Sequence, residues 1–364
     1  INPRSETKSI IEVVSALQAQ PDLSPRDDRD PLSGLIKDAK QWVSPTGDYA
    51  NTRHSALKQI TTENAGKLQL AWQFSTGVLR GHEGAPLVVG DVMYLHTPFP
   101  NIVYALDLKD PDHKILWKYE PKQDPNVIPV MCCDTVNRGL AYGDGKIFLA
   151  QADTTLVALD ATTGKEIWVH ENLRGIATRG INYWESKDRS DRRLIFQIND
   201  HLQEIDAKTG KSILSFGQDG LVSLKEGLGR DPSTIPRIQS SNPGRIFENL
   251  LLLGSTTGEN YFAAPGDLRA FDVLTGAQVW SFHTIPQPGE FGYETWPKDA
   301  WKYSGGTNTW GEITVDVKRG IAYFPTGSPT YDYYGADRIG SNLFANSLVA
   351  LDARTGKRLW HFQT

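Results

Sequence analysis

The 364-residue chain lacks several features that would each indicate a function. It has only two cysteines and a net charge of −5, and no apolar run approaches the roughly 18 residues of a membrane-spanning helix. A charge near balance argues against a nucleic-acid partner and an anionic membrane surface. There is no zinc spacing, no phosphate-binding glycine loop before a helix and no nucleophile-elbow serine. We therefore expect no nucleic-acid binding and no membrane span.

The N-terminal region differs from the rest of the chain. The sequence begins at Ile1 without a methionine or an apolar signal region, so we expect any export signal to have been removed or never present. Apolar positions follow helical spacing in residues 9–17 and 32–39, with prolines between them. We expect a helical extension over residues 1–45 and one further domain over residues 46–364.

Glycine (33 residues), tyrosine (13) and tryptophan (10) are prominent, and a unit containing Gly and Trp recurs. Each unit has an apolar strand ending in Asp, a Thr-Gly turn and a second strand ending in Trp. Copies begin at Ala158, Ala270 and Ala350, and a copy at Glu204 has Leu214 in place of Trp. The pattern is typical of a hairpin whose turn glycine needs a positive φ, and the constant Asp-to-Trp step fixes its register.

One such hairpin sheet cannot bury both of its faces alone. The copies must therefore stack around an axis, with the large Trp side chains between neighbouring sheets. The predicted fold class is all-β, a β-propeller of four-stranded blades; sandwiches and barrels also repeat hairpins but rarely repeat the same turn and aromatic together. The distance between copies grows from about 45 to about 80 residues, which predicts long insertions where a propeller builds its site.

The two cysteines are adjacent, at Cys132 and Cys133. If they pair with each other they close a strained eight-membered ring, a geometry that is usually kept for a function. The alternative is two small, buried, reduced side chains in a strand, because free Cys packs as a hydrophobe. Adjacency alone leaves both interpretations open.

Other candidate site residues lie in loops. Glu83 occupies a glycine-flanked bend, either as a site carboxylate or as a solvated loop residue. Arg138 could bind a carboxylate-bearing ligand through its fork of donors, or pair with Asp134. Trp310 does not end a hairpin unit, so it is a candidate for a ligand-facing aromatic or for packing. The loop 325–335 mixes Tyr and Asp, which suits a sugar, a metal ion or a plain tight turn.

These motifs resemble those of the pyrroloquinoline quinone-dependent alcohol dehydrogenases, bacterial quinoproteins built as eight-bladed propellers. Over residues 48–170 the chain is most similar to the lanthanide-using methanol dehydrogenases. The similarity is carried by residues 48–53, 72–77, 81–89 and 131–142. From about Arg179 onward, including residues 286–296, the chain looks more like the glucose dehydrogenase-like quinoproteins.

The resemblance implies a cofactor site. In the family the paired cysteines, here Cys132 and Cys133, form a vicinal disulfide against one face of pyrroloquinoline quinone. The residues that match Glu83 and Arg138 contact the cofactor, and the one that matches Trp310 stacks on its other face. A planar, anionic cofactor between a disulfide and an indole makes physical sense of this set, so the resemblance favours the oxidised pair.

The resemblance also implies a Ca²⁺ or lanthanide ion. The family's metal-binding Glu corresponds to Glu259, although the spacing differs by about two residues, and Ser328 stands where the family has an Asn, a better ligand. The family's catalytic Asp, a second lanthanide Asp and a basic cofactor contact follow the strand that here precedes Thr364. We therefore expect the catalytic base beyond Thr364, with Asp332 and then Glu294 as candidates within the chain.

The implied activity is quinoprotein oxidation of a primary alcohol such as methanol to the aldehyde. The alternatives are a glucose-type sugar dehydrogenase and a propeller scaffold with an incomplete site; Leu214, Ser328 and the missing C-terminal residues favour the scaffold. Five or six of the family's eight blades are expected, which suggests the front of a longer protein or a shortened form. The implied partners are an alcohol or sugar and a cytochrome c-type electron acceptor, with a homodimer left open. The implied location is the periplasm, where vicinal disulfides persist.

Overall fold

The computed structural model describes residues 31–131, 134–176, 179–240 and 242–364. The helix expected at residues 9–17 and the Cys132–Cys133 pair lie outside these ranges. The described chain divides into two compact units, called here the N-terminal unit (Asp28–Leu221) and the C-terminal unit (Val222–Thr364).

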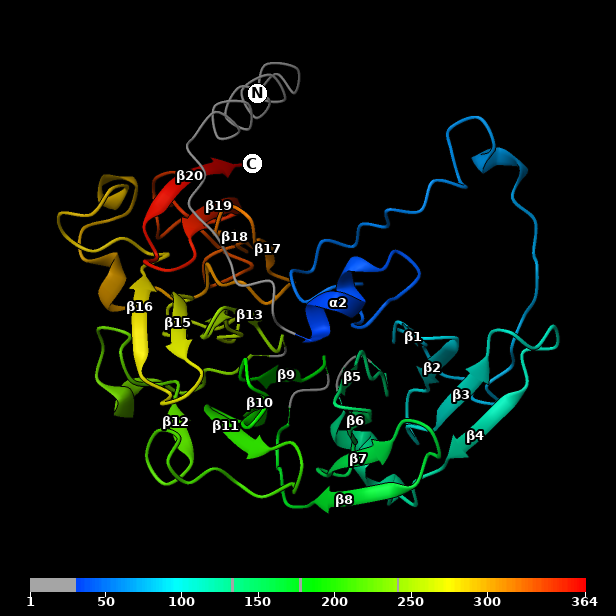
Figure 1. Ribbon diagram of the computed structural model, residues 1–364. Coiled ribbons are helices and arrows are strands. Elements are labelled where there is room, and N and C mark those ends of the chain that lie inside the picture. The colour runs from blue at the N-terminus through cyan, green and yellow to red at the C-terminus, as the bar shows by residue number, and fades with distance from the viewer. Residues whose placement is uncertain (1–30, 132–133, 177–178, 241) are drawn as a thin grey trace. The chain divides into compact units, whose positions relative to one another are not determined.

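The N-terminal unit contains short helices and three four-stranded sheets (Figure 1). The helices are α2 (Pro31–Lys37), η1 (Ala65–Lys67) and η2 (Pro125–Val130). The first sheet consists of β1 (Leu87–Val89), β2 (Val92–His96), β3 (Val103–Asp107) and β4 (Ile115–Tyr119). The second consists of β5 (Leu140–Gly143), β6 (Lys146–Ala150), β7 (Leu156–Asp160) and β8 (Glu166–His170). The third consists of β9 (Asn182–Glu185), β10 (Arg192–Ile198), β11 (His201–Asp206) and β12 (Leu221–Ser223), whose last residues pass the unit boundary.

The C-terminal unit contains two further four-stranded sheets. The fourth sheet consists of β13 (Arg245–Phe247), β14 (Leu250–Leu253), β15 (Leu268–Asp272) and β16 (Gln278–Phe282). The fifth consists of β17 (Thr314–Asp316), β18 (Ile321–Pro325), β19 (Ser347–Asp352) and β20 (Arg358–Gln363). Single 3-10 turns lie in the connections: η3 (Pro232–Thr234), η4 (Tyr293–Thr295) and η5 (Ala300–Lys302).

All five sheets have the same topology. Their strands follow one another in chain order, and neighbouring strands run antiparallel, so each sheet is a meander. The prediction of an all-β fold with four-stranded blades is confirmed. Between residues 31 and 364, apart from the undescribed positions, no helix combines the length and the apolar character needed to cross a bilayer.

The repeated turns share one hydrogen-bonding pattern. Asp160 Oδ1 accepts from the backbone N–H groups of Thr162 (3.0 Å) and Thr163 (2.8 Å) and from the Thr163 hydroxyl (2.9 Å). Equivalent bonds form at Asp206, Asp272 and Asp352. An Asp side chain can satisfy a tight turn's N–H groups in this way, which explains why the repeat places Asp at the end of the strand.

In three of the units the final Trp connects neighbouring blades. Trp117 Nε1 donates to the Ala161 carbonyl at 3.0 Å, and a Cβ on Gly164 would lie 2.5 Å from the Trp117 ring. Trp168 donates in the same way to Ala207, and Trp280 to Ala353. The Thr-Gly turn of one blade therefore receives the indole of the blade before it, and glycine provides both the positive φ and the space.

The degenerate copy behaves differently after its turn. Asp206 forms the usual turn, but only an isolated bridge between Ile205 and Ser212 follows, and Leu214 is 69% exposed. The expected strand ending at Leu214 is absent from the described structure, and β12 supplies the outer strand instead. Leucine has no indole N–H, so this segment lacks the hydrogen bond to the next blade that Trp117, Trp168 and Trp280 make.

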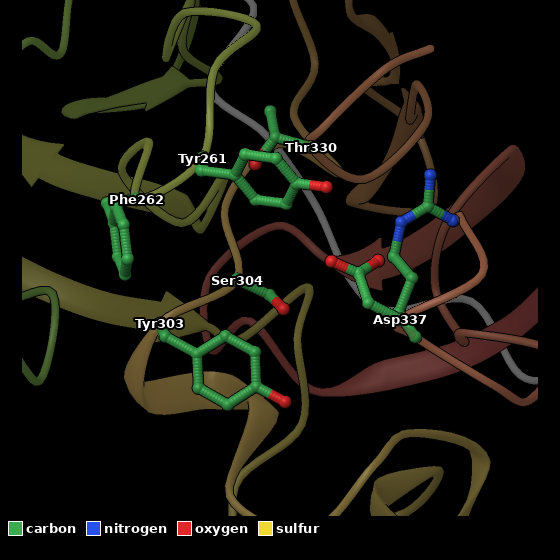
Figure 2. Close-up of a pocket in the computed structure, with 7 residues that line it drawn as sticks. Tyr261, Phe262, Tyr303, Ser304, Thr330 and Asp337 are labelled. Carbon is green, nitrogen blue, oxygen red and sulfur yellow. The ribbon is translucent and has the colours of Figure 1, made fainter. Parts of the chain in front are cut away.

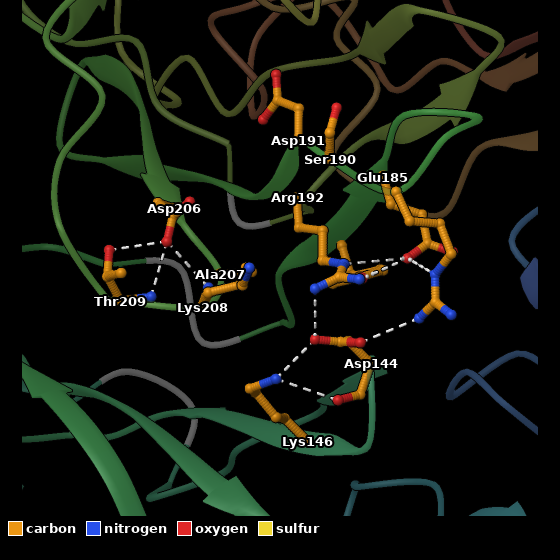
Figure 3. Close-up of polar contacts among 12 residues, drawn as sticks. Asp144, Lys146, Glu185, Ser190, Asp191, Arg192, Asp206, Ala207, Lys208 and Thr209 are labelled. Atoms are coloured by element: carbon orange, nitrogen blue, oxygen red, sulfur yellow. Dashed lines mark hydrogen bonds and ion pairs between the residues drawn. The ribbon is translucent and has the colours of Figure 1, made fainter.

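Apolar and polar contacts both join blades of the N-terminal unit. Buried aliphatic and aromatic residues of the second and third sheets form one core cluster. Asp144 accepts from Lys146 (2.8 Å), Arg189 (3.0 Å) and Arg192 (3.0 Å), and Glu185 accepts from Arg189 at 3.2 Å (Figure 3). Burial opposes ionisation of Asp144, but the Lys146 hydrogen bond and the three cations together lower its pKa. This network joins the second sheet to the third.

Candidate functional site

The expected cofactor residues Glu83 and Arg138 lie together in the N-terminal unit, although 55 positions separate them in the sequence. Arg138 Nη2 is 2.5 Å from Glu83 Oε2, and the two side chains are 31% and 41% exposed. Arg138 therefore does not pair with Asp134, which instead binds Arg80 at 3.1 Å. The result is a charged pair that remains accessible to a ligand.

Two chain segments, residues 80–84 and 134–139, support this pair. Asp134 Oδ2 accepts from the Gly81 backbone N–H at 3.0 Å. This hydrogen bond is the main reason why the pKa of Asp134 is lowered. Before the cysteines, η2 ends at Val130. The chain on both sides of Cys132 and Cys133 is thus ordered by hydrogen bonds, while the pair itself lies outside the described residues.

His96, a residue that the sequence did not single out, lies against both segments. It ends β2 and is 5% exposed. Its Nε2 lies 3.0 Å from the Asn137 carbonyl oxygen, and a Cβ on Gly84 would lie 2.3 Å from its Cε1. Burial lowers the pKa of His96 to about 4. Because a carbonyl can only accept, Nε2 carries the proton of the neutral ring.

Trp310 and Ser328 lie on adjoining segments of the C-terminal unit. The Thr307 N–H donates to the Ser328 carbonyl at 2.8 Å, and the Gly327 N–H donates to the Asn308 carbonyl at 3.0 Å. A Cβ on Gly327 would lie 3.8 Å from the Trp310 indole nitrogen. Trp310 is 52% exposed, so its ring presents surface to solvent rather than filling a blade core.

Glu259 and Asp332 are close enough to interact electrostatically. Burial raises the pKa of Asp332, the negative charge of Glu259 raises it further, and Arg338 opposes the shift. Within the described ranges no three His, Cys, Asp or Glu side chains form a group that could hold a metal ion. Glu294 lies exposed in η4 and does not line the cavity described next. Of the expected carboxylates, Glu259 and Asp332 therefore interact with each other, but in the part of the chain that the structure describes they do not belong to a complete set of metal ligands.

A cavity of about 200 Å³ opens in the C-terminal unit (Figure 2). Its lining residues are Tyr261, Phe262, Tyr303, Ser304, Thr330, Asp337 and Arg338. Tyr261 stacks on Tyr331 with ring centroids 5.1 Å apart. Burial raises the pKa of Tyr261, and Asp337 contributes through its charge and a hydrogen bond. The sequence indicated only the tyrosine-rich loop; the walls from residues 261–262 and 303–304 were not predicted.

Arg230 holds together the backbone around this cavity. Its guanidinium donates to the carbonyl of Trp301 (2.6 Å), to that of Ala263 (3.2 Å) and to that of Ser304. Burial lowers the pKa of Arg230 to about 10, so it remains a cation at neutral pH. Two of the cavity walls are thereby held by one side chain.

Comparison with known proteins places these features in a family. The profile of the PQQ β-propeller domain of glucose, ethanol and alcohol dehydrogenases matches residues 42–145 and 140–364. The lanthanide-dependent methanol dehydrogenase of Methylorubrum extorquens is 41% identical over 352 residues, which cover 91% of this chain and 47% of that protein. The quinone alcohol dehydrogenase subunit of Gluconobacter oxydans is 34% identical over 339 residues, which cover 88% of this chain and 37% of that protein.

Solved structures agree with this assignment. A europium-containing methanol dehydrogenase superimposes with a TM-score of 0.51 at 32% identity, covering 91% of this chain and 50% of that one. The quinohemoprotein alcohol dehydrogenase of Comamonas testosteroni gives 0.52 at 25% identity, covering 97% and 44%. The chain spans about half the length of the curated relatives that it matches. The blades, their repeated turns and the profile match across nearly all of the described residues show that this chain belongs to the PQQ-dependent dehydrogenase β-propeller family.

Proposed function

We propose that the protein takes part in the oxidation of a primary alcohol, such as methanol, to the aldehyde with pyrroloquinoline quinone. The observation that supports this proposal is the Glu83–Arg138 pair, because these two residues, which are expected to contact the cofactor, come together from distant segments. The similarity to a lanthanide-dependent methanol dehydrogenase favours an alcohol as substrate.

The residues present fit a planar, anionic cofactor. The Arg138 guanidinium is partly exposed and can donate hydrogen bonds to a carboxylate, while Glu83 orients it. Trp310 offers an exposed ring for stacking. The Cys132–Cys133 disulfide against the quinone stays a prediction. When bound, the quinone would accept a hydride, and with it two electrons, from the alcohol carbon, while the hydroxyl proton goes to a base.

The proposed metal ion and catalytic base involve other residues of the chain. Glu259 and Ser328 are the proposed ligands for Ca²⁺ or a lanthanide, both of which prefer oxygen donors. Because Ca²⁺ takes about six to eight oxygen ligands, these two residues would need further donors. Asp332 is the weak candidate for the base among the residues present, and its raised pKa suits a residue that takes the hydroxyl proton.

The proposed partners follow from the relatives. Methanol dehydrogenases named for cytochrome c are 34–35% identical to this chain, so a cytochrome c-type protein is the proposed electron acceptor. The periplasm is the proposed location, because a vicinal disulfide persists in an oxidising compartment. A homodimer is a further candidate assembly, and light scattering after gel filtration would measure the oligomeric state.

A sugar is the second candidate substrate, and the cavity favours it. Tyr261, Phe262 and Tyr303 offer aromatic faces, and Asp337 and Arg338 offer charged groups that can bind hydroxyls. Its volume of about 200 Å³ is below the range for drug-sized ligands and suits a small molecule. Methanol needs no such lining.

A dye-reduction assay tests the proposed function. The purified protein is loaded with pyrroloquinoline quinone and either Ca²⁺ or a light lanthanide, and dye reduction is followed with methanol, ethanol and glucose. Reduction with the small alcohols supports the alcohol dehydrogenase, and reduction with glucose alone supports the sugar enzyme. Retention of no quinone together with no reduction would leave the scaffold as the remaining interpretation.

A further inference from the structure

His96 touches neither an expected ligand nor the surface, yet it contacts the neighbours of both charged cofactor residues. Its ring lies beneath Gly84, the residue after Glu83, and Nε2 donates to the carbonyl of Asn137, the residue before Arg138. The imidazole therefore occupies the space between the two segments that carry the Glu83–Arg138 pair.

Asn137 and His96 are both fixed by hydrogen bonds to neighbouring strands. Asn137 is 3% exposed, and its amide donates to the carbonyl of Ala150 in β6 at 2.7 Å. His96 itself belongs to β2, which pairs with β1 and β3 on its two sides. The imidazole thus links a strand of the first sheet to a segment fixed on the second, and the Glu83–Arg138 pair spans the same junction.

The space and the hydrogen bond at this position restrict which side chains fit. The Gly84 backbone lies so close that a Cβ there would be 2.6 Å from His96 Nε2, so a larger ring would displace the bend. A smaller or purely apolar side chain would leave the Asn137 carbonyl without its donor. The position therefore needs a flat side chain with an N–H group that reaches the Asn137 carbonyl oxygen, as Nε2 of His96 does.

We propose that His96 is a positioning residue of the cofactor site, which sets the spacing of Glu83 and Arg138 through Gly84 and Asn137. This inference rests on the proposed function, in which that pair contacts the quinone. It adds a determinant of quinone affinity that makes no contact with the quinone.

Three variants test the proposal by binding. His96→Leu removes the donor, His96→Gln keeps an amide N–H near the place of Nε2, and Tyr94→Phe is the matched control. Tyr94 lies on the same strand, is buried, and donates to the Ala161 carbonyl at 3.1 Å, but contacts neither segment through that bond. We expect His96→Leu to weaken pyrroloquinoline quinone binding about tenfold or more, and the other two to change it less than about threefold.

A double-mutant cycle separates positioning from general destabilisation. Glu83→Gln should weaken quinone binding in the wild-type and Tyr94→Phe backgrounds equally. In the His96→Leu background its effect should shrink to less than about threefold, because the carboxylate is no longer aligned. Additive effects of His96→Leu and Glu83→Gln, or equal losses in His96→Leu and Tyr94→Phe, would overturn the proposal.

A measurement without cofactor distinguishes failure of this inference from failure of the proposed function. Arg138 Nε is buried, so its N–H signal should be observable by NMR in the unloaded protein. His96→Leu should move this signal, whereas His96→Gln and Tyr94→Phe should leave it in place. If the wild-type protein binds no quinone, the proposed function fails and this signal alone decides the positioning role; an unmoved signal would overturn it.

Discussion

The buried imidazole of His96 should make stability depend on pH. Its pKa falls from 6.5 to about 4 on folding because burial disfavours the charged ring. Between these values the unfolded chain binds a proton that the folded chain does not, so stability falls as pH falls. His96 contributes its full effect above pH 6.5 and loses it progressively towards pH 4. The unfolded chain takes up this proton mainly below pH 6.5, so about 1.5 pH units count between pH 7 and pH 5. At about 1.4 kcal/mol per pH unit, the expected loss of unfolding free energy is about 2 kcal/mol.

The His96→Gln variant isolates this contribution. All other ionisable groups are shared, including His82, whose charge also disfavours protonation of His96. Urea unfolding at pH 7 and pH 5, at constant ionic strength, should therefore show that the wild-type protein loses about 2 kcal/mol more than the variant. Equal losses in the two proteins, or a His96 pKa near 6.5 in an NMR titration, would refute the reasoning.

Two other perturbations follow from the structure, and a third prediction follows from the family resemblance. Asp144→Asn removes the carboxylate that three cations share and should lower the unfolding free energy by about 2 kcal/mol at pH 7. This difference between variant and wild type should vanish as pH falls through the lowered pKa of Asp144. A difference that does not depend on pH would contradict the role of the network. Trp280→Phe removes the bond to Ala353 and should cost about 1–2 kcal/mol in urea unfolding, whereas unchanged stability would argue against indole docking. Mass spectrometry of the non-reduced protein after alkylation should find no free thiol at Cys132 or Cys133, and two labelled thiols would disprove the vicinal disulfide.

The repeated unit made the blades predictable. Asp160, Thr163 and Gly164 form a local turn whose chemistry is written in consecutive residues, and Trp168 follows at a constant step. The step failed as a guide only where Leu214 replaces Trp. There the strand depended on a docking contact with another blade, and the sequence could show the loss of the indole but not where the outer strand would form instead.

The charged part of the site was only partly predictable. The sequence offered a carboxylate-bearing ligand or Asp134 as the partner of Arg138, whereas in the folded protein Arg138 pairs with Glu83 and Asp134 pairs with Arg80. His96 gave no signal, because a single histidine at the end of an apolar strand is usually a core residue. Its importance comes from contacts with Gly84 and Asn137, which depend on how the first and second sheets pack.

Quinone binding tests the central claim most directly. Pyrroloquinoline quinone is titrated into the purified protein and its absorbance followed, in parallel with Arg138→Leu and the distant surface variant Lys165→Leu. The account predicts saturable, one-to-one binding by the wild-type protein and Lys165→Leu, and a loss of about tenfold or more in affinity for Arg138→Leu, because a charge-assisted bond to a carboxylate is removed. No saturable binding by the wild-type protein, or equal affinity in Arg138→Leu, would contradict it.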